Sequence, residues 1–296
     1  MRWNEIDVVV SKTATDLVAL LLYECGSNGS IIHDDQEDEQ GRIRITAYFP
    51  PDKEGVKETV TQGMEALADR TPALGPWLVL EKTADDNSWL YTWQDYFHPK
   101  KISPHFWAAP AWERIQPPEG EDVILIDPGL AFGSGLHDTT CMCVEYLEEA
   151  IHPDDFVFDI GTGTGILAIA AAKLGASHVT AVDFDKKAVH QAKRNARLND
   201  VADKISVYNS DLLTAIAAGV QRADVIVANL VTDAVLALMP TVTEYMIRYG
   251  VFIASGIIDD RIDEVRQGAA ENGLAIEHET LRNGWYALYM RRQDHA

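Results

Sequence analysis

The sequence has few cysteines and no long apolar segment. Only 3 of its 296 residues are cysteine, and their spacing fits neither a disulfide framework nor a zinc site. Cys141 and Cys143 would share one short helix, so we expect reduced, buried thiols and predict no metal centre. The early apolar run at residues 17–22 is too short for a secretory signal, and no stretch approaches the roughly 20 apolar residues of a membrane span. We therefore expect a cytoplasmic protein without a membrane partner.

Basic residues are also scarce. The chain has 25 Lys and Arg against 46 Asp and Glu, which gives a formal net charge of -21. Such a protein repels a phosphate backbone at long range and attracts basic partners. We expect no direct nucleic-acid partner unless positive charge is strongly segregated, and a basic protein substrate fits better. Acidity that serves only solubility is an equally open interpretation.

The third glycine of the dinucleotide-binding fingerprint is missing. Residues 156–160 predict a buried strand, followed by Gly161, Gly163 and Gly165 and then an Ala-rich helix. The fingerprint G-x-G-x-x-G requires glycine at position 166, which is Ile166. Three alternating glycines still let the backbone turn tightly against a ligand, because no Cβ intervenes. We predict a cofactor turn here, and a tight turn without a ligand is the alternative.

A second predicted strand, residues 179–182, is followed by Asp183. An acidic side chain at this position can accept hydrogen bonds from both ribose hydroxyls of any adenosine ligand. The pattern Asp-x-Gly-x-Gly-x-Gly from Asp159, followed by a strand-end acid, resembles the class I S-adenosylmethionine-dependent methyltransferases. Ile166 disfavours an NAD-linked oxidoreductase.

The periodicity divides the chain into three parts. Residues 1–84 follow the order β-α-β-β-α-β, which is typical of a ferredoxin-like α+β domain. Residues 85–118 are expected to be a connection, with Trp89, Trp93 and Phe97 on one face of a linker helix that packs between domains. From residue 119 to 296, strands and helices alternate, which predicts an α/β domain with a doubly wound parallel sheet.

Asn283 and Gly284 separate the last two predicted strands of the third part. Asn-Gly is a strong signal for a two-residue hairpin, so the last strand is expected to enter the sheet antiparallel. A parallel sheet with such a reversed final strand is typical of the methyltransferase fold rather than of a dehydrogenase.

The glycine-rich run at residues 127–140 is the most distinctive segment. Together with residues 159–170 and 225–230, it closely resembles the PrmA family of bacterial ribosomal protein methyltransferases, and the resemblance covers nearly the whole chain. It implies transfer of methyl groups from S-adenosylmethionine to lysine ε-amines and the α-amine of the protein at the base of the ribosomal stalk (protein eleven of the large subunit). It also implies that the N-terminal domain captures this basic protein.

The resemblance and the glycine turn together define a set of expected cofactor contacts. Asp211 lies where many class I methyltransferases contact adenine, although a helix N-cap is equally open. Asn229 has an uncharged carbonyl acceptor that would orient the amine or contact the cofactor, and capping the next helix is the alternative. The expected cofactor-binding residues are Thr140, Gly161, Gly163, Asp183, Asp211 and Asn229.

Methyl transfer is an in-line displacement, so positioning supplies much of the catalysis. The amine must be neutral, whereas an unperturbed lysine with a pKa of about 10.4 is mostly protonated at neutral pH. No strong general base is evident, and we expect the proton to leave to water. Gly129, Gly133 and Gly135 with Phe132 predict a lid over the cofactor, and an inert connection is the alternative.

Two positions depart from the family pattern. The loop from Gly133 to Thr140 reads Gly-Ser-Gly-Leu-His-Asp-Thr-Thr, where the family commonly has Gly-Thr-Gly-Thr-His-Pro-Thr-Thr, and Gln94 follows Trp93 where lysine is usual. Both lie where substrate access is set. Two alternatives therefore stay open, a related methyltransferase for another protein or a small amine, and a non-catalytic binding module.

Overall fold

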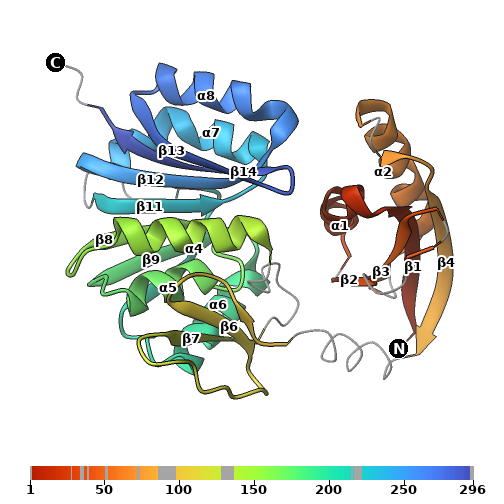
Figure 1. The fold of residues 1–296 in the computed structure, drawn as a ribbon, viewed down its shortest axis with the longest axis horizontal. Helices are drawn as coiled ribbons and strands as arrows, with labels where there is room; N and C mark the ends of the chain where they lie inside the picture. The colour runs from red at the N-terminus through yellow and green to blue at the C-terminus, as the bar shows by residue number, and fades with distance from the viewer. Residues whose placement is uncertain are drawn as a thin grey trace. The chain divides into compact units, whose positions relative to one another are not determined.

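The computed structural model forms two compact units, residues 1–98 and 99–296, which are described separately (Figure 1). The residues described are 2–27, 29–33, 37–38, 40–50, 53–71, 74–85, 98–127, 137–214, 216 and 222–293. The expected aromatic linker helix and the tip of the expected lid lie outside the described residues.

The N-terminal unit has four antiparallel strands in the order β2-β3-β1-β4. Val8 of the central strand pairs with Ile45 on one side and Val79 on the other. Both helices pack on one face of the sheet, where Val18 and Met64 are fully buried. This is the expected ferredoxin-like arrangement. Its elements are β1 (Arg2–Ser11), α1 (Thr15–Glu24), β2 (Ser30–His33), β3 (Arg42–Phe49), α2 (Val56–Arg70) and β4 (Leu78–Asp85).

The larger unit contains a seven-stranded sheet in the order β10-β9-β8-β11-β12-β14-β13. All neighbouring pairs are parallel except those of β14, which runs antiparallel to both β12 and β13. The predicted doubly wound sheet with a reversed last strand is confirmed. The strands are β8 (Phe156–Ile160), β9 (His178–Asp183), β10 (Ile205–Asn209), β11 (Ala223–Asn229), β12 (Met246–Ile258), β13 (Leu274–Arg282) and β14 (Trp285–Arg292).

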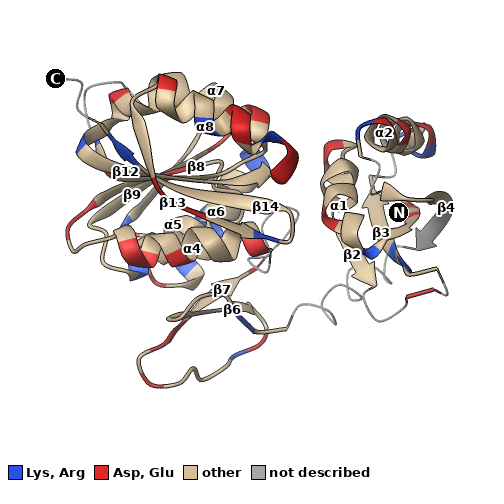
Figure 2. Cartoon of the chain, turned by 45° about the horizontal axis from the view of Figure 1, so that its top comes forward, with Lys and Arg blue, Asp and Glu red and all other residues tan. Residues whose placement is uncertain are grey.

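Helices cover both faces of this sheet (Figures 1 and 2). Three lie on one face with α5 between α4 and α6, and two lie on the other face. Phe158, Ile226 and Phe252 are at most 1% exposed between the strands and the second helix layer. The helices are α4 (Asp138–Ala150), α5 (Ile166–Lys173), α6 (Lys186–Leu198), α7 (Thr232–Val242) and α8 (Ile262–Glu271).

The structure differs from the sequence-based expectations at two places. The expected strand or lead-in near residues 123–126 is β7 (Asp122–Ile126), which pairs with β6 (Phe106–Pro110) and β5 (Lys100–Lys101) in a small separate sheet. The periodicity of residues 231–247 predicts a single helix, but the helix ends at Val242, and Met246 begins β12. Pro240 lies in its last turn, where a missing N–H donor weakens the helix.

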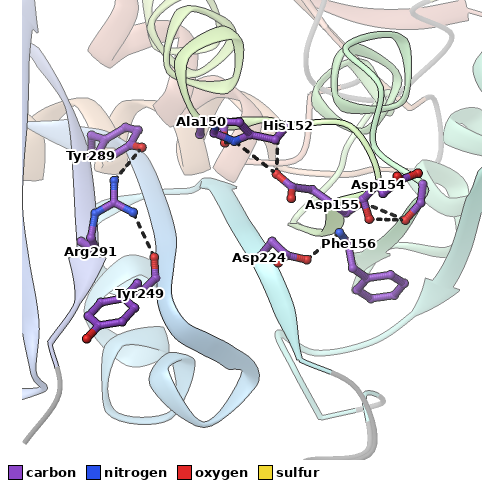
Figure 3. A network of polar contacts seen from close by, with 10 residues as sticks. Ala150, His152, Asp154, Asp155, Phe156, Asp224, Tyr249, Tyr289 and Arg291 are labelled. Atoms are coloured by element: carbon purple, nitrogen blue, oxygen red, sulfur yellow. Dashed lines mark hydrogen bonds and ion pairs between the residues drawn. The ribbon is translucent and has the colours of Figure 1, made fainter.

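Polar contacts fasten the amino ends of the parallel strands (Figure 3). The main-chain N–H of Phe156, which begins β8, donates to Asp224 Oδ2 at 2.8 Å, which joins β8 to β11. Tyr249 lies in the exposed first part of β12, and its carbonyl oxygen accepts a hydrogen bond from Arg291 of β14 at 3.0 Å. These contacts lie opposite the carboxyl ends of the strands, where ligands bind in doubly wound sheets. Within the described part of the chain, no helix is long and apolar enough to span a membrane.

Candidate active site

The carboxyl ends of β8, β9 and β11 bring three of the expected residues to one edge of the sheet. Ile160 pairs with Val182 of β9 and with Ala228 of β11, so the residues that follow lie next to one another. Gly161 follows β8, Asp183 ends β9 and Asn229 ends β11. The crevice at such an edge is the usual ligand site of an open α/β sheet.

The three glycines form a tight turn with left-handed backbone at every second residue. Their φ angles are 74° at Gly161, 54° at Gly163 and 87° at Gly165. The N–H groups of Gly161 and Thr162 both donate to the carbonyl of Val182 at 2.9 Å, which fixes the turn against β9. A Cβ at Gly161 would overlap the side chain of Leu230. Main-chain hydrogen bonds to β9 therefore hold the turn, and the close approach of Leu230 requires glycine at position 161.

Asp183 is held by the same turn. Its Oδ2 accepts a hydrogen bond from Gly163 N–H and its Oδ1 from Asp185 N–H, both at 2.9 Å. The side chain is largely buried, and this burial raises the pKa of the carboxyl above its ordinary value. Two main-chain donors thus orient the carboxylate while each oxygen keeps a lone pair for a ligand hydroxyl.

Phe184, the next residue, is a feature that the sequence analysis missed. It is 75% exposed, although phenylalanine is usually buried. The amide of Asn209 donates to the carbonyl oxygens of both Asp183 and Phe184, at 2.9 and 2.7 Å, and so fixes the backbone at this point. The sequence signal that could have indicated this exposed side chain is an apolar residue directly after the acid that ends a strand.

Asp159 lies beneath the turn and is fully buried. Its Oδ2 accepts from the Thr162 hydroxyl at 2.6 Å and from Ala168 N–H at 3.0 Å, whereas Oδ1 has no hydrogen-bond partner among the described residues. Burial raises the pKa of this carboxyl to about 7, and the negative charge of Asp183 adds to the shift. A buried acceptor without a partner is uncommon in folded proteins and indicates a place for an added donor.

Thr140, in the first turn of α4, and Asn229, at the end of β11, are far apart in sequence and meet at the site. Asn229 Nδ2 donates to Thr140 Oγ1 at 3.2 Å, so the carbonyl oxygen of the amide is left as an acceptor. The alternative role for Asn229, capping α7, is not what the structure shows, because the N-cap there is Val231 without a side-chain cap bond.

The first turn of α4 is set by His137. The sequence predicts a helix from Asp138 with Asp138 or Thr139 as its cap; the helix does begin at Asp138, but its N-cap is His137. The imidazole Nδ1 accepts from Thr139 N–H at 3.3 Å, and the ring packs edge-on against Trp285 at 5.5 Å between centroids. Aromatic packing therefore fixes the turn that carries Thr140.

Asp211 lies one residue beyond a direct contact with β9. The N–H of Ser210 donates to the carbonyl of Asp183 at 2.9 Å, and Asp211 itself is exposed. The alternative N-cap role receives no support, because residues 212–214 form a turn and no helix begins there within the described residues.

Asn195 of α6 joins two parts of the site and was also missed. It is fully buried, and its Nδ2 donates to the carbonyls of Thr164 at 2.8 Å and Asp127 at 3.1 Å. Its Oδ1 accepts from Asp127 N–H at 3.0 Å. The sequence does contain a signal for this role: Asn195 is a polar residue on the buried face of α6, which otherwise carries apolar residues such as Ala188 and Ala192.

The residues present fit S-adenosylmethionine, a cation with an adenosine group. The glycine backbone of the turn can approach the ligand closely, the Asp183 carboxylate can accept hydrogen bonds from ribose hydroxyls, and the orphaned Oδ1 of Asp159 can take a further donor. A positively charged ligand would also offset the repulsion between the two buried carboxylates. Among the described residues, no group of three His, Cys, Asp or Glu side chains could hold a metal ion.

The sheet order, the reversed last strand and the glycine turn define a class I methyltransferase. Residues 2–293 match the family described as ribosomal protein L11 methyltransferase (PrmA), and the chain belongs to this family. The ribosomal protein L11 methyltransferase of Desulfitobacterium hafniense is 38% identical over 99% of both chains. That of Caldanaerobacter subterraneus is 35% identical over 99% of this chain and all of the relative.

A solved structure agrees with the fold. The ribosomal protein L11 methylase of Lactobacillus delbrueckii is 35% identical, with a TM-score of 0.63, and the match covers 67% of this chain and 100% of that one. The resemblance drawn from the motifs is thereby confirmed, together with the prediction of an S-adenosylmethionine-dependent protein methyltransferase.

Proposed function

We propose that the protein methylates lysine ε-amines and the α-amine of ribosomal protein L11, the substrate that the names of its relatives state. L11 would be the basic partner of this acidic chain, and the reaction would take place in the cytoplasm. The observation that carries the proposal is the uncharged Asn229–Thr140 pair beside the glycine turn. An uncharged acceptor orients an amine while stabilising its protonated, unreactive form less than a carboxylate would.

The site geometry supports the proposed cofactor contacts. Asp183 accepts hydrogen bonds from the ribose hydroxyls, and the main chain of Gly161 and Gly163 lies against the ligand. Phe184 packs on the adenine ring, with Asp211 beside it, because both follow strands that end at this edge.

Asn229 and Thr140 act on the substrate side. Thr140 Oγ1 receives the amide N–H of Asn229, which turns Asn229 Oδ1 toward an incoming N–H donor. The bound sulfonium supplies the methyl group, and the chain positions the amine lone pair in line with it. The amine loses its proton to water, since none of the residues assigned to the site is a strong base.

The N-terminal unit captures the substrate. Its edge strand β4 presents Leu78 and Leu80, which are 46% and 41% exposed, while Val79 between them is buried in the core. Two exposed leucines on one face of a strand are suited to apolar contact with a protein. Leu80→Glu should raise the KM for L11 without changing the dissociation constant of the cofactor. Leu281→Glu, at a comparably exposed position on β13, is the matched control.

Intact-mass spectrometry tests the reaction directly. Unmethylated L11 incubated with the protein and S-adenosylmethionine should gain mass in single-methyl steps, and Asp183→Ala should abolish the gain when the cofactor is limiting. If L11 gains no mass while calorimetry detects cofactor binding, the substrate assignment is wrong and the methyltransferase assignment stands.

A further inference from the structure

The outer face of α6 concentrates positive charge in an otherwise acidic protein. The chain carries a net charge of -21, yet this helix contains no acidic residue. The expectation of no nucleic-acid partner rests on the total charge of the chain. It does not apply to this face, because the charge of α6 is positive. The exposed residues of α6, which we call the basic face, are Lys186, Lys187, His190, Lys193, Arg194 and Arg197.

The cations of the basic face are largely without internal partners. Arg194 forms an ion pair with Asp127 at 2.8 Å. Within the described part of the chain, no carboxylate lies within ion-pair distance of Lys186, Lys187, Lys193 or Arg197. In α8, by contrast, Arg266 pairs with Asp263 and Glu279. The positive charge of α6 is therefore open to a partner.

This arrangement costs the helix stability. Lys186 and Lys187 occupy the first turn, where the helix dipole disfavours cations, and the N-cap carboxylate of Asp185 is the one acidic side chain of the helix start that offsets them. Lys193 and Arg197 are four residues apart, a spacing at which like charges destabilise a helix. Folding does not require these residues, because the opposite side of the helix supplies the packing through Val189 and its alanines. An external anion would relieve both penalties.

We propose that the basic face of α6 binds the phosphate backbone of duplex RNA. Residues 186, 190, 193 and 197 rise by about 4.5 to 6 Å per step and form a row about 16 Å long, which suits an extended array of phosphates. The choice of RNA over DNA rests on the proposed function, since a ribosomal protein substrate meets RNA during assembly.

The chemistry of the face argues against a membrane. A helix that binds a bilayer surface exposes a broad apolar side to the acyl chains. The apolar side of α6 is already buried, with Val189 at 6% and Ala192 at 2% exposure, and every exposed residue of the helix is a lysine, an arginine or a histidine. Phosphates, which need only cations, are the better match.

The inner side of the same helix holds the cofactor turn through Asn195 and Thr164. An RNA bound on the basic face would thus lie about one helix diameter, roughly 10 Å, from the active site. Such docking would place the enzyme beside RNA-bound substrate without RNA entering the site.

Fluorescence anisotropy with a labelled RNA duplex of about 20 base pairs tests the proposal. The full-length protein should bind at about 50 mM salt, with an affinity that falls steeply as salt rises. The variant K186Q/K187Q/K193Q/R197Q should bind at least tenfold more weakly, and its logarithmic salt dependence should shrink by about one per cation removed. The control K57Q/R70Q/R261Q/R266Q, with an equal change in net charge, should keep wild-type affinity within about twofold.

Several results would overturn the proposal. These are the absence of RNA binding by the wild-type protein, equal losses in both variants, tighter binding of a DNA duplex of the same length, and binding of phosphatidylserine vesicles in place of RNA. Methylation of free L11 by the basic-face variant should match that of the wild type, because none of the four residues belongs to the active site. A wild-type protein that binds RNA but leaves L11 unmethylated would contradict the proposed function and not the RNA site.

Discussion

The side-chain amide of Asn195 donates a hydrogen bond over 2.8 Å to the main-chain carbonyl of Thr164, in the centre of the glycine turn. The same amide bonds both main-chain polar groups of Asp127, where the glycine-rich run begins. One buried side chain on α6 thus couples two segments that are far apart in sequence. Because Asn195 and Thr164 are fully buried, water cannot replace the bond between them, and the geometry of the turn depends on this amide.

Asn195→Asp should therefore weaken both the fold and the cofactor site. The change keeps the shape but replaces a donor with an acceptor that faces two carbonyl oxygens. We expect a loss of about 2 to 4 kcal/mol in the free energy of unfolding, measured by urea denaturation. Asn199→Asp is the control, since Asn199 bonds Leu125 in the same way but does not touch the turn. Only the Asn195 variant should also lose cofactor affinity in calorimetry.

Asp183 should matter for the ligand more than for the fold. Its carboxylate is buried, and its pKa is raised by that burial, so the free protein gains little from its charge. Asp183→Ala should raise the dissociation constant of S-adenosylhomocysteine by roughly 10- to 100-fold, as expected for the loss of charged hydrogen bonds. Asp203→Ala, at an exposed position after α6, should leave the constant unchanged. Equal affinities in the two variants would show that the ribose is held elsewhere.

Much of this architecture was predictable because its signals are local. The bounds of α6 follow from its apolar periodicity between Asp185, which caps it, and Asn199. The glycine turn and the strand-end Asp183 are read from consecutive residues, and Asn283-Gly284 indicated the reversed last strand. Each of these features depends on residues close in sequence.

The features that were missed depend on contacts between distant segments. The β5-β6-β7 sheet pairs Phe106 with Asp122, and β6 is a short strand that ends in a proline. The role of Asn195 exists only because α6 packs against residues 127 and 164. His137 caps α4 in a setting fixed by Trp285, which lies nearly 150 positions away in the chain. No local pattern encodes such pairings.

Gly256 is expected to be essential for the shape of the site. It has a φ of +83° at a bulge in β12, and a Cβ there would overlap the main-chain oxygen of Leu230, the residue after Asn229. Gly256→Ala should destabilise the protein by more than 2 kcal/mol, because a rigid backbone atom must move in addition to the left-handed strain.

Gly284 provides the matched control for that substitution. Its φ is +82°, and nothing lies within 4 Å of a Cβ built there. Gly284→Ala should therefore cost only the backbone strain, about 1 to 2 kcal/mol. The difference between the two variants in thermal or urea unfolding isolates the clash with Leu230. Gly256→Ala should also slow methyl transfer, through displacement of Asn229, and equal effects of both variants would contradict this account.

Asp159 should make the stability of the free protein depend on pH in an unusual direction. Its pKa is about 7 in the folded protein, because burial disfavours the charged form, against an ordinary value of 3.8. Between about pH 4 and pH 7 the folded state therefore holds a proton that the unfolded state has released. The free energy of unfolding must then fall as pH rises through this window, by on the order of a few kcal/mol for this group alone.

Asp159→Asn removes that dependence and keeps the shape of the side chain. The amide oxygen can still accept from Thr162 and Ala168, while its NH₂ occupies the position of the orphaned oxygen. Urea unfolding of both proteins at pH values from 5 to 8 measures the difference. The wild type should lose stability relative to the variant as pH rises, and the variant should be the more stable protein at pH 8. A constant difference across that range would mean that Asp159 is charged throughout. The buried carboxylate would then have to be stabilised by contacts other than those made by Thr162 and Ala168.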